Sequence, residues 1–224
     1  TPRSSAWLAL AREREGRVPV FFSAGCNRRC AFCVEAGFLG GRVVPRPVED
    51  TLDEIEGLHR AAGVRRFFLA GSELNVPDAR ALTRLMLGLA DRRLDVDVRG
   101  FLQPAPVDDA LLDAMEAAGH DPSDFSFEFG HFDDRMLRRG AGPASRRQLQ
   151  RLVELWVRRG YRTLGGSALL GGHPEETWGS IERALLTIRE FDDALPDGLG
   201  LAWSPGARVY PASPLGRWGR DHPG

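Results

Sequence analysis

Three cysteines are the residues whose types and spacing most plainly allow chemistry. Cys26, Cys30 and Cys33 are the only cysteines of the 224-residue chain, and they follow an apolar, strand-like stretch at 18–24. Thiolates bind zinc and iron–sulfur clusters, and four ligands complete a structural site of either kind. Three thiolates therefore leave one position open, where a ligand or substrate can bind.

Neither a set of disulfides nor a zinc site fits the cysteines as well as a cluster does. A disulfide framework needs an even number of cysteines. A zinc site would need a fourth ligand, such as His131 or His173, and neither histidine has local ligand spacing relative to the cysteines. A cube-type iron–sulfur cluster is the favoured interpretation, with zinc or chance clustering as the alternatives.

The Cys-x3-Cys-x2-Cys spacing, with Phe32 just before the last cysteine, resembles the signature of the radical S-adenosylmethionine (SAM) superfamily. The resemblance implies that the three cysteines bind three irons of a four-iron (4Fe–4S) cluster and that SAM chelates the fourth. It also implies that an electron from the cluster splits a carbon–sulfur bond of SAM and releases a 5′-deoxyadenosyl radical. The cofactors would carry the difficult chemistry, while the protein positions and shields them.

Composition limits the partners, the cellular compartment and the reaction types that are expected. The net charge is −1, which gives no reason to expect a nucleic-acid or membrane partner. No apolar run is long enough to span a bilayer and no signal peptide is evident, so the unpaired cysteines favour the reducing cytoplasm. The basic residues are all arginine, which excludes Schiff-base chemistry on a lysine of this chain.

Alternation of short apolar runs with amphipathic stretches predicts an α/β fold with parallel strands. Strands are expected at 18–24, 66–70, 96–102, 125–129, 162–170 and 199–204. Helices are expected from 48 to a stop at Gly63, around 82–89, over 107–118, around 149–156 and over 177–191. A closed eight-stranded barrel usually takes about 250 residues. The six units therefore predict a partial, TIM-like (β/α)6 barrel, the fold that the resemblance also implies.

The same reasoning divides the chain into three parts. Residues 1–16 are expected to lead in from an upstream domain, because the chain begins at Thr1 without an initiator methionine. Residues 17–215 form the predicted core domain, and residues 216–224 an exit segment toward a C-terminal region.

Chemistry in parallel α/β folds gathers at the carboxyl ends of the strands. Gly71, Ser72 and Glu73 follow the second strand and partly resemble the family's Gly-Gly-Glu-Pro motif, with Ser72 replacing the second glycine and Leu74 the proline. The resemblance implies that Glu73 binds the ammonium group of SAM. The alternative is a solvated acid at a helix N-terminus.

Further cofactor candidates come from the later strands. Glu128 lies between two phenylalanines on the fourth strand and is expected to bind the ribose of SAM, or else to point to solvent. Gly171 and Gly172 follow the fifth strand and resemble the turn beside the adenine, although a plain strand-to-helix turn would look the same. Phe32 and Ser167 complete the predicted cofactor-binding residues.

The C-terminal stretch and the start of the chain without an initiator methionine suggest a subgroup. The stretch from Arg208 to Leu215 resembles a motif of cobalamin-dependent members, so that Arg208 and Tyr210 are candidate substrate contacts; a rigid exit loop is the alternative. Glu49 follows Cys33 by 16 residues. It is either a helix-entry acid or, as in a group of tryptophan methyltransferases, a ligand of the open iron.

The predicted function is therefore a cobalamin-dependent C-methyltransferase of specialised metabolism, acting on a small molecule or peptide. Cobalamin would be held mainly by a domain outside this chain, and a flavodoxin or ferredoxin would supply electrons. The alternatives are a cobalamin-independent enzyme that abstracts hydrogen and a non-catalytic metal-binding module. No general acid or base is assigned.

Overall fold

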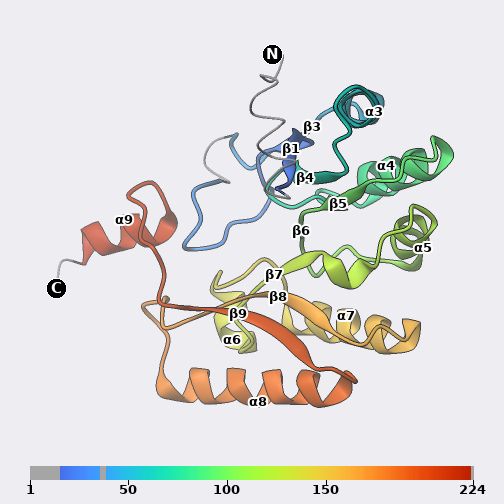
Figure 1. Ribbon diagram of the computed structural model, residues 1–224. Helices are drawn as coiled ribbons and strands as arrows, with labels where there is room; N and C mark the ends of the chain where they lie inside the picture. Colours follow the sequence, from blue (N-terminus) through green and yellow to red (C-terminus); the bar gives the residue numbers. More distant parts are fainter. Residues whose placement is uncertain (1–15, 36–38, 223–224) are drawn as a thin grey trace.

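The computed structural model describes residues 16–35 and 39–222 as a curved array of parallel strands covered by helices (Figure 1). Two parallel sheets make up the array, with strand orders β1-β4-β5 and β6-β7-β8-β9. The strands are β1 (Val18–Phe21), β4 (Arg66–Ala70), β5 (Asp97–Arg99), β6 (Phe101–Leu102), β7 (Ser126–Gly130), β8 (Leu164–Leu170) and β9 (Leu199–Pro205). The predicted α/β class and partial TIM-like barrel are confirmed.

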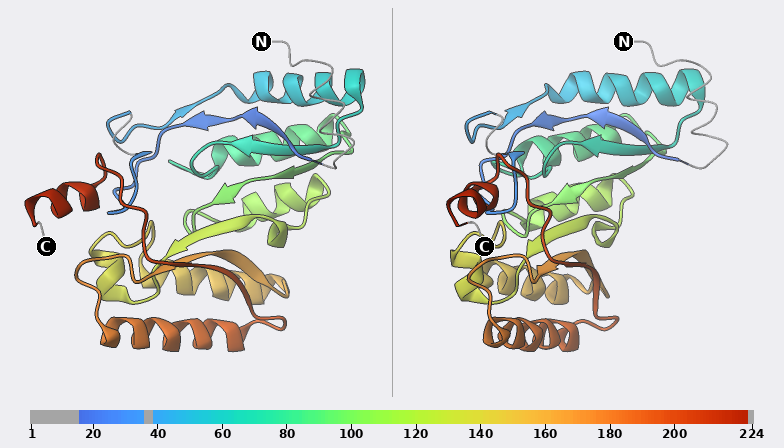
Figure 2. Two further views of the ribbon diagram at one scale, coloured as in Figure 1. Left: turned by 60° about the vertical axis from the view of Figure 1, so that its left-hand side comes forward. Right: turned by 90° about the vertical axis from the view of Figure 1, so that its left-hand side faces the viewer.

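Helices cover the outer face of the strands and leave the inner face for the site (Figures 1 and 2). They are α3 (Val48–Ala62), α4 (Arg80–Asp91), α5 (Asp109–Ala117), α7 (Arg146–Arg159) and α8 (Trp178–Ala194). Helix α7 begins with a capping box between Ser145 and Gln148 and ends at Gly160 in the left-handed conformation, φ 77°. Helix α3 ends in the same way at Gly63, as predicted.

The third strand departs from the prediction of one strand over 96–102. It breaks at Gly100, so that β5 pairs with β4 while β6 pairs with β7. At the break the loop after β4 packs against the backbone: the Leu74 amide donates to the Phe101 carbonyl oxygen (2.9 Å). A Cβ added at Gly100 would lie 2.4 Å from Leu74 Cδ1, so a larger residue would require the buried Leu74 side chain to shift.

The first strand is also shorter than predicted. Its parallel pairing ends at Phe21, and β2 (Ser23–Ala24) pairs instead with β3 (Val44–Pro45) in an antiparallel two-stranded ladder. This ladder closes the loop that carries the cysteines. A pair of two-residue strands is too short to show the alternation by which strands are predicted.

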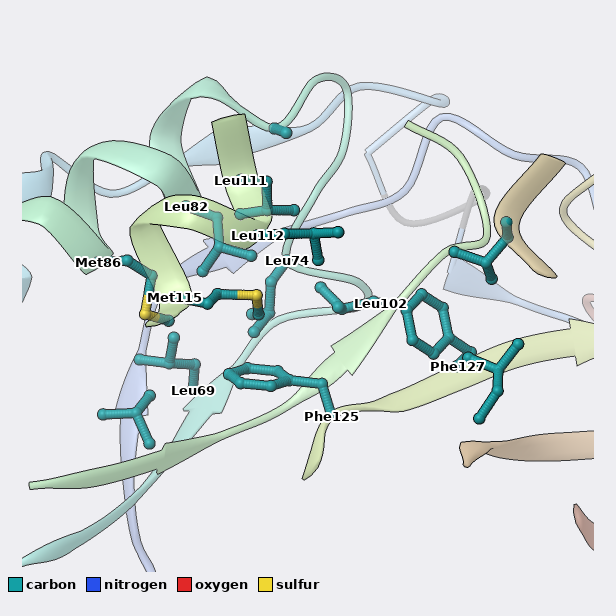
Figure 3. Packing of buried hydrophobic residues seen from close by; sticks show 14 of the residues in the cluster. Leu69, Leu74, Leu82, Met86, Leu102, Leu111, Leu112, Met115, Phe125 and Phe127 are labelled. Atoms are coloured by element: carbon teal, nitrogen blue, oxygen red, sulfur yellow. The ribbon is translucent and has the colours of Figure 1, made fainter. Parts of the chain in front are cut away.

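The core lies between the strands and the outer helices. Leu69, Leu74 and Leu102 meet the leucines and methionines of α4 and α5 there, beside Phe125 and Phe127 (Figure 3). Farther along, Trp156 of α7 packs edge-on against Phe127 with ring centroids 5.2 Å apart. Burying each such side chain contributes about 1.5–3 kcal/mol, which holds the strand ends in fixed positions.

Three short helical elements were not predicted: η1 (Pro122–Asp124), α6 (Asp134–Arg138) and α9 (Pro214–Asp221). Helix α9 lies apart from the outer helices, next to the cysteine loop (Figures 1 and 2), where the Leu215 amide donates to the Ala31 carbonyl oxygen (2.8 Å). It spans the predicted boundary between core and exit segment, and most of the predicted lead-in lies outside the described residues. No helix in the described ranges is both long and apolar enough to cross a membrane.

Candidate functional site

The cysteine loop is held by close backbone packing. Gly25, just before Cys26, has φ 81°, and a Cβ there would lie 2.2 Å from the Arg42 carbonyl oxygen. The sulfur of Cys26 accepts a hydrogen bond from the Arg28 amide, and that of Cys33 from the Glu35 amide, both at 3.4 Å. Amide donors of this kind stabilise negative charge on cysteine sulfurs and on clusters that they bind.

All three cysteines line one cavity on the inner face of the barrel. Phe32, Glu73 and Glu128 line the same cavity, so predicted site residues from three separate parts of the chain come together. The full lining is Cys26, Arg28, Cys30, Phe32, Cys33, Glu73, Glu128, Gly130 and Pro143.

The candidate zinc ligands are not gathered around one point. Within the described ranges, no three histidine, cysteine or acidic side chains converge on one ion. His131 and His173, the candidate fourth zinc ligands, bond instead to Glu176 and to the Arg139 carbonyl oxygen. In a four-iron cluster each cysteine binds a different iron, so the three sulfurs need not converge.

Glu73 lies directly beside the first cysteine. Its Oε2 atom is 3.5 Å from Cys26 Sγ and accepts a hydrogen bond from Gln103 Nε2 at 3.0 Å. Gln103 Oε1 in turn accepts from Arg28 Nε at 2.5 Å. This chain of polar side chains joins the ends of the second and third strands to the cysteine loop.

Gln103 is a site residue that the sequence analysis missed. It is fully buried and is held by Asn75: the Gln103 amide donates to Asn75 Oδ1, and Asn75 Nδ2 donates to the Gln103 carbonyl oxygen, both at 2.9 Å. A signal was available, because Gln103 immediately follows the third predicted strand. The rule that chemistry lies at strand ends applies to it as it does to Glu73.

Gly71 and Ser72 shape the site without lining the cavity. A Cβ on Gly71 would lie 2.6 Å from Ser23 Oγ, so a larger residue would require the Ser23 hydroxyl to move. The Ser72 hydroxyl contacts the Gly25 carbonyl oxygen (3.1 Å) and the Glu35 carboxylate. The serine that replaces the family's second glycine therefore fastens both ends of the cysteine loop to the end of β4.

Glu128 occupies the inner face of β7 because the side chains of a strand alternate. Its neighbours Phe127 and Phe129 are buried in the core, whereas the Glu128 carboxylate lines the cavity. Ser167, directly opposite on β8, donates a hydrogen bond to Glu128 Oε2 at 2.5 Å. The two predicted cofactor residues are thus a bonded pair.

The cavity is lined by several acidic groups and by one basic residue, Arg28, whose guanidinium bonds to Gln103 and to the Ala105 carbonyl oxygen rather than to a carboxylate. Burial raises the pKa of Cys26 and of Cys30 to about 12, and it also raises the pKa of Cys33, Glu73 and Glu128. No arginine in the described part of the chain forms an ion pair with either carboxylate. Buried anionic groups need compensating positive charge, which the irons of a cluster and the sulfonium and ammonium groups of SAM would provide.

The turn after β8 is fixed by a buried pair. Glu176 Oε2 accepts from the Gly172 amide (3.0 Å), and Oε1 lies 3.1 Å from His131 Nε2. Because His131 Nδ1 accepts from the Asp133 amide (2.8 Å), its proton lies on Nε2 and is donated to Glu176. Burial alone would raise the pKa of Glu176, but these hydrogen bonds outweigh it and lower the pKa. Gly171 and Gly172 lie outside the cavity lining.

Eight predicted site residues are absent from the cavity lining: Gly71, Ser72, Ser167, Gly171 and Gly172, described above, and Glu49, Arg208 and Tyr210. Glu49 is 74% exposed on the first turn of α3, where it pairs with Arg92 at 2.7 Å. Arg208 and Tyr210 are exposed after β9 and contact each other, with Arg208 Nη1 3.3 Å from the Tyr210 hydroxyl. Their roles as iron ligand and substrate contacts stay predictions.

Comparison with known families identifies the family whose members share this site. The family model described as the Radical SAM superfamily matches residues 20–188. The chain belongs to the radical SAM superfamily. A 4Fe–4S cluster and SAM are accordingly its cofactors, and the cavity provides the three cysteines that such a cluster requires.

Individual relatives agree at the level of the family. The ribosomal protein uS12 methylthiotransferase RimO of Acidothermus cellulolyticus is 32% identical over 191 residues, which cover 82% of this chain and 39% of that protein. RimO of Bacteroides fragilis is 26% identical over 198 residues, covering 85% of this chain and 41% of the relative. The chain thus spans about two fifths of the length of the relatives it matches.

Solved structures give a complementary match. The radical SAM methyltransferase TsrM from Kitasatospora setae, with tryptophan substrate and a SAM analogue bound, superimposes with a TM-score of 0.75 and 25% identity; the match covers 93% of this chain and 39% of that one. Another TsrM structure, with cobalamin and a [4Fe-4S] cluster bound, gives a TM-score of 0.71 at 24% identity. Coproporphyrinogen III oxidase from Escherichia coli, at 17% identity and a TM-score of 0.58, shares the fold alone.

Proposed function

We propose that this radical SAM core serves a cobalamin-dependent methyltransferase that transfers the methyl group of SAM to a carbon atom of a small molecule or peptide. The observation that carries the proposal is the similarity to TsrM, which extends over 93% of the chain at a TM-score of 0.75. The stretch from Arg208 to Leu215, with its resemblance to cobalamin-dependent members, supports the same subgroup.

Residues of the cavity have distinct roles in this proposal. Cys26, Cys30 and Cys33 hold three irons. Glu73, oriented by Gln103 at 3.0 Å, accepts the ammonium group of SAM in a charge-assisted hydrogen bond. Phe32 lies against the cluster and helps to exclude water.

Residues on the later strands and in the turn after β8 would bind the nucleoside part of SAM. Glu128 lines the cavity and is hydrogen-bonded to Ser167, and the oxygens of this pair can bind the ribose hydroxyls. The turn at Gly171 and Gly172, held by Glu176, borders the adenine. Bound cobalamin supplies a cobalt atom that carries the methyl group between SAM and the substrate.

Arg208 and Tyr210 extend from the end of β9, where they are exposed and lie within contact distance of each other. A guanidinium beside a phenol suits a substrate that carries a carboxylate and an aromatic ring. Tryptophan, which occupies TsrM, has both groups and is the first substrate to test. Glu49 would act as an iron ligand only if the start of α3 released it from Arg92.

Methylthiotransfer is the second candidate function, because a RimO relative is 32% identical over 82% of the chain. Those relatives act on a ribosomal protein, as their name states, so a macromolecular substrate belongs to this alternative. Hydrogen abstraction by a deoxyadenosyl radical, without cobalamin, is the third.

Products from isotopically labelled SAM distinguish the three functions. We would incubate the full-length protein anaerobically with trideuteromethyl-SAM, cobalamin and tryptophan, and analyse the products by mass spectrometry. The proposal predicts S-adenosylhomocysteine and a product heavier by one labelled methyl group, both dependent on cobalamin and lost in Cys30→Ala. Added methyl and sulfur together would support methylthiotransfer. If 5′-deoxyadenosine were the only product of SAM and formed without cobalamin, the result would contradict the proposal and support hydrogen abstraction.

A further inference from the structure

The cysteine loop borders a second cavity on its outer side, opposite the one that faces the barrel. Cys30 and Cys33 line both cavities, so the cysteine loop lies between the inner site and the outer cavity. The outer cavity is lined by Arg29, Cys30, Cys33, Val34, Ala212, Pro214 and Arg217. A cluster bound by these cysteines would therefore lie next to this face.

Two exposed arginines border this cavity without a carboxylate partner. The Arg29 side chain forms no hydrogen bond or ion pair within the described ranges, where the Arg217 guanidinium donates only to the Ala212 carbonyl oxygen (2.7 Å). Arg208, between β9 and α9, and Arg220 of α9 likewise bond to a hydroxyl and to a carbonyl oxygen, respectively, and to no acid that the structure describes.

This pattern differs from that of many arginines elsewhere. Arg92 and Arg159, on the outer helices, each contact three carboxylates. The chain has a net charge of −1, so an uncompensated positive surface at the cysteine loop is a local feature and not a consequence of overall charge.

The outer face is also held in place relative to the cysteines. The Ala31 amide donates to the Gly140 carbonyl oxygen, and its own carbonyl oxygen accepts from the Leu215 amide, both at 2.8 Å. Ser213 caps α9 by accepting from the Gly216 amide at 3.0 Å. Arg217 is therefore fixed beside the loop by α9, and a partner bound to it would sit at a defined distance from the cluster.

We infer that this outer face is the docking surface for an acidic, one-electron donor protein of the flavodoxin or ferredoxin class. Its positive charge would attract and orient a partner with a negative surface around its redox group. The donor loses one electron and the cluster behind Cys30 and Cys33 gains it, while the inner cavity stays available to SAM. The inference depends on the cluster and not on which substrate the enzyme methylates.

Charge reversal tests the surface on the full-length, anaerobically reconstituted protein. We would compare Arg29→Glu/Arg217→Glu with Arg147→Glu/Arg151→Glu, a matched pair of exposed arginines on α7 that form no ion pair within the described ranges. Stopped-flow absorbance would follow cluster reduction by a reduced flavodoxin and, separately, by photoreduced deazaflavin, a small neutral reductant.

The first pair should slow reduction by flavodoxin about tenfold or more and flatten its dependence on ionic strength. Iron content and the rate with deazaflavin should stay within about twofold of the wild-type values, and Arg29→Gln/Arg217→Gln should give a smaller decrease. Unchanged rates with flavodoxin would overturn the inference, as would equal slowing with deazaflavin or in the α7 pair. A wild-type protein without iron would also overturn the inference, because there would be no cluster to reduce.

Discussion

Gln103 Nε2 and Glu73 Oε2 are joined by a 3.0 Å hydrogen bond that connects the ends of two neighbouring strands beside Cys26. Gln103 is itself fixed by the fully buried Asn75, so the Glu73 carboxylate is oriented before any cofactor binds. Such preorganisation reduces the entropy that binding would otherwise lose. The cavity thus offers a positioned anion next to the three thiols.

Replacing Glu73 by Gln should weaken SAM binding while iron content stays at the wild-type level. The substitution keeps the shape and the hydrogen bond to Gln103 but removes the charge, and hydrogen bonds to charged groups contribute about 1.5–3 kcal/mol. We expect SAM affinity to fall by about tenfold or more in isothermal titration calorimetry. Glu182→Gln, on the exposed surface of α8, is the control and should bind SAM normally. Wild-type affinity in Glu73→Gln would remove this role.

The acidic cavity predicts an unusual pH dependence of stability for the cofactor-free protein. Because burial raises the folded-state pKa of Glu73 and Glu128 above the ordinary 4.5, the folded state binds protons more tightly than the unfolded chain. Their contribution to the free energy of unfolding therefore falls as pH rises from 4.5 through the raised pKa values. Glu73→Gln/Glu128→Gln should be more stable than wild type at pH 8, by a margin that shrinks toward pH 4.5. Urea denaturation across this range would show the trend, and a margin independent of pH would contradict it.

Removal of His131 should destabilise the turn after β8. His131 is 1% exposed and donates a hydrogen bond to Glu176. His131→Ala therefore leaves a cavity and removes one hydrogen-bond donor from the Glu176 carboxylate. We expect a loss of about 2–4 kcal/mol in the free energy of unfolding. His222→Ala, at an exposed position on the last turn of the chain, should change it by less than about 0.5 kcal/mol. Equal effects of the two substitutions in urea denaturation would show that the buried pair contributes little.

Adjacent glycines of β8 should respond differently to alanine. A Cβ at Gly166 would lie 2.2 Å from the Phe127 carbonyl oxygen and 2.4 Å from the Phe129 ring, whereas at Gly165 the only neighbour within 4 Å is 3.8 Å away. Gly166→Ala should therefore destabilise the protein by about 1–3 kcal/mol or more. Gly165→Ala should be close to neutral in thermal denaturation. The reverse order would contradict this packing of β8 against β7.

The sequence was sufficient for the elements whose signals are local. Gly63 and Gly160 end α3 and α7 as predicted, and the apolar runs correctly located six strand positions. The cysteine loop, Glu73 and Glu128 were found because they lie at or near strand ends. These features depend on residue type and spacing, which can be read without knowing what packs against them.

Features that depend on distant contacts could not be predicted from local signals. The break at Gly100 follows from the approach of Leu74, and the docking of α9 on the cysteine loop follows from a bond between Leu215 and Ala31. The pair of Glu128 with Ser167 needed the register between β7 and β8. Each contact joins residues far apart in the sequence, so neither periodicity nor spacing carries information about it.

Anaerobic reconstitution of the full-length protein tests the central claim, that three cysteines hold a cluster whose open iron faces an acidic cavity. Iron and acid-labile sulfide analysis should give about four of each per chain, and the electron paramagnetic resonance spectrum of the reduced protein should change when SAM is added. Cys30→Ala should lose both properties. A colourless, iron-free protein would contradict the account, as would a cluster whose electron paramagnetic resonance spectrum does not change when SAM is added.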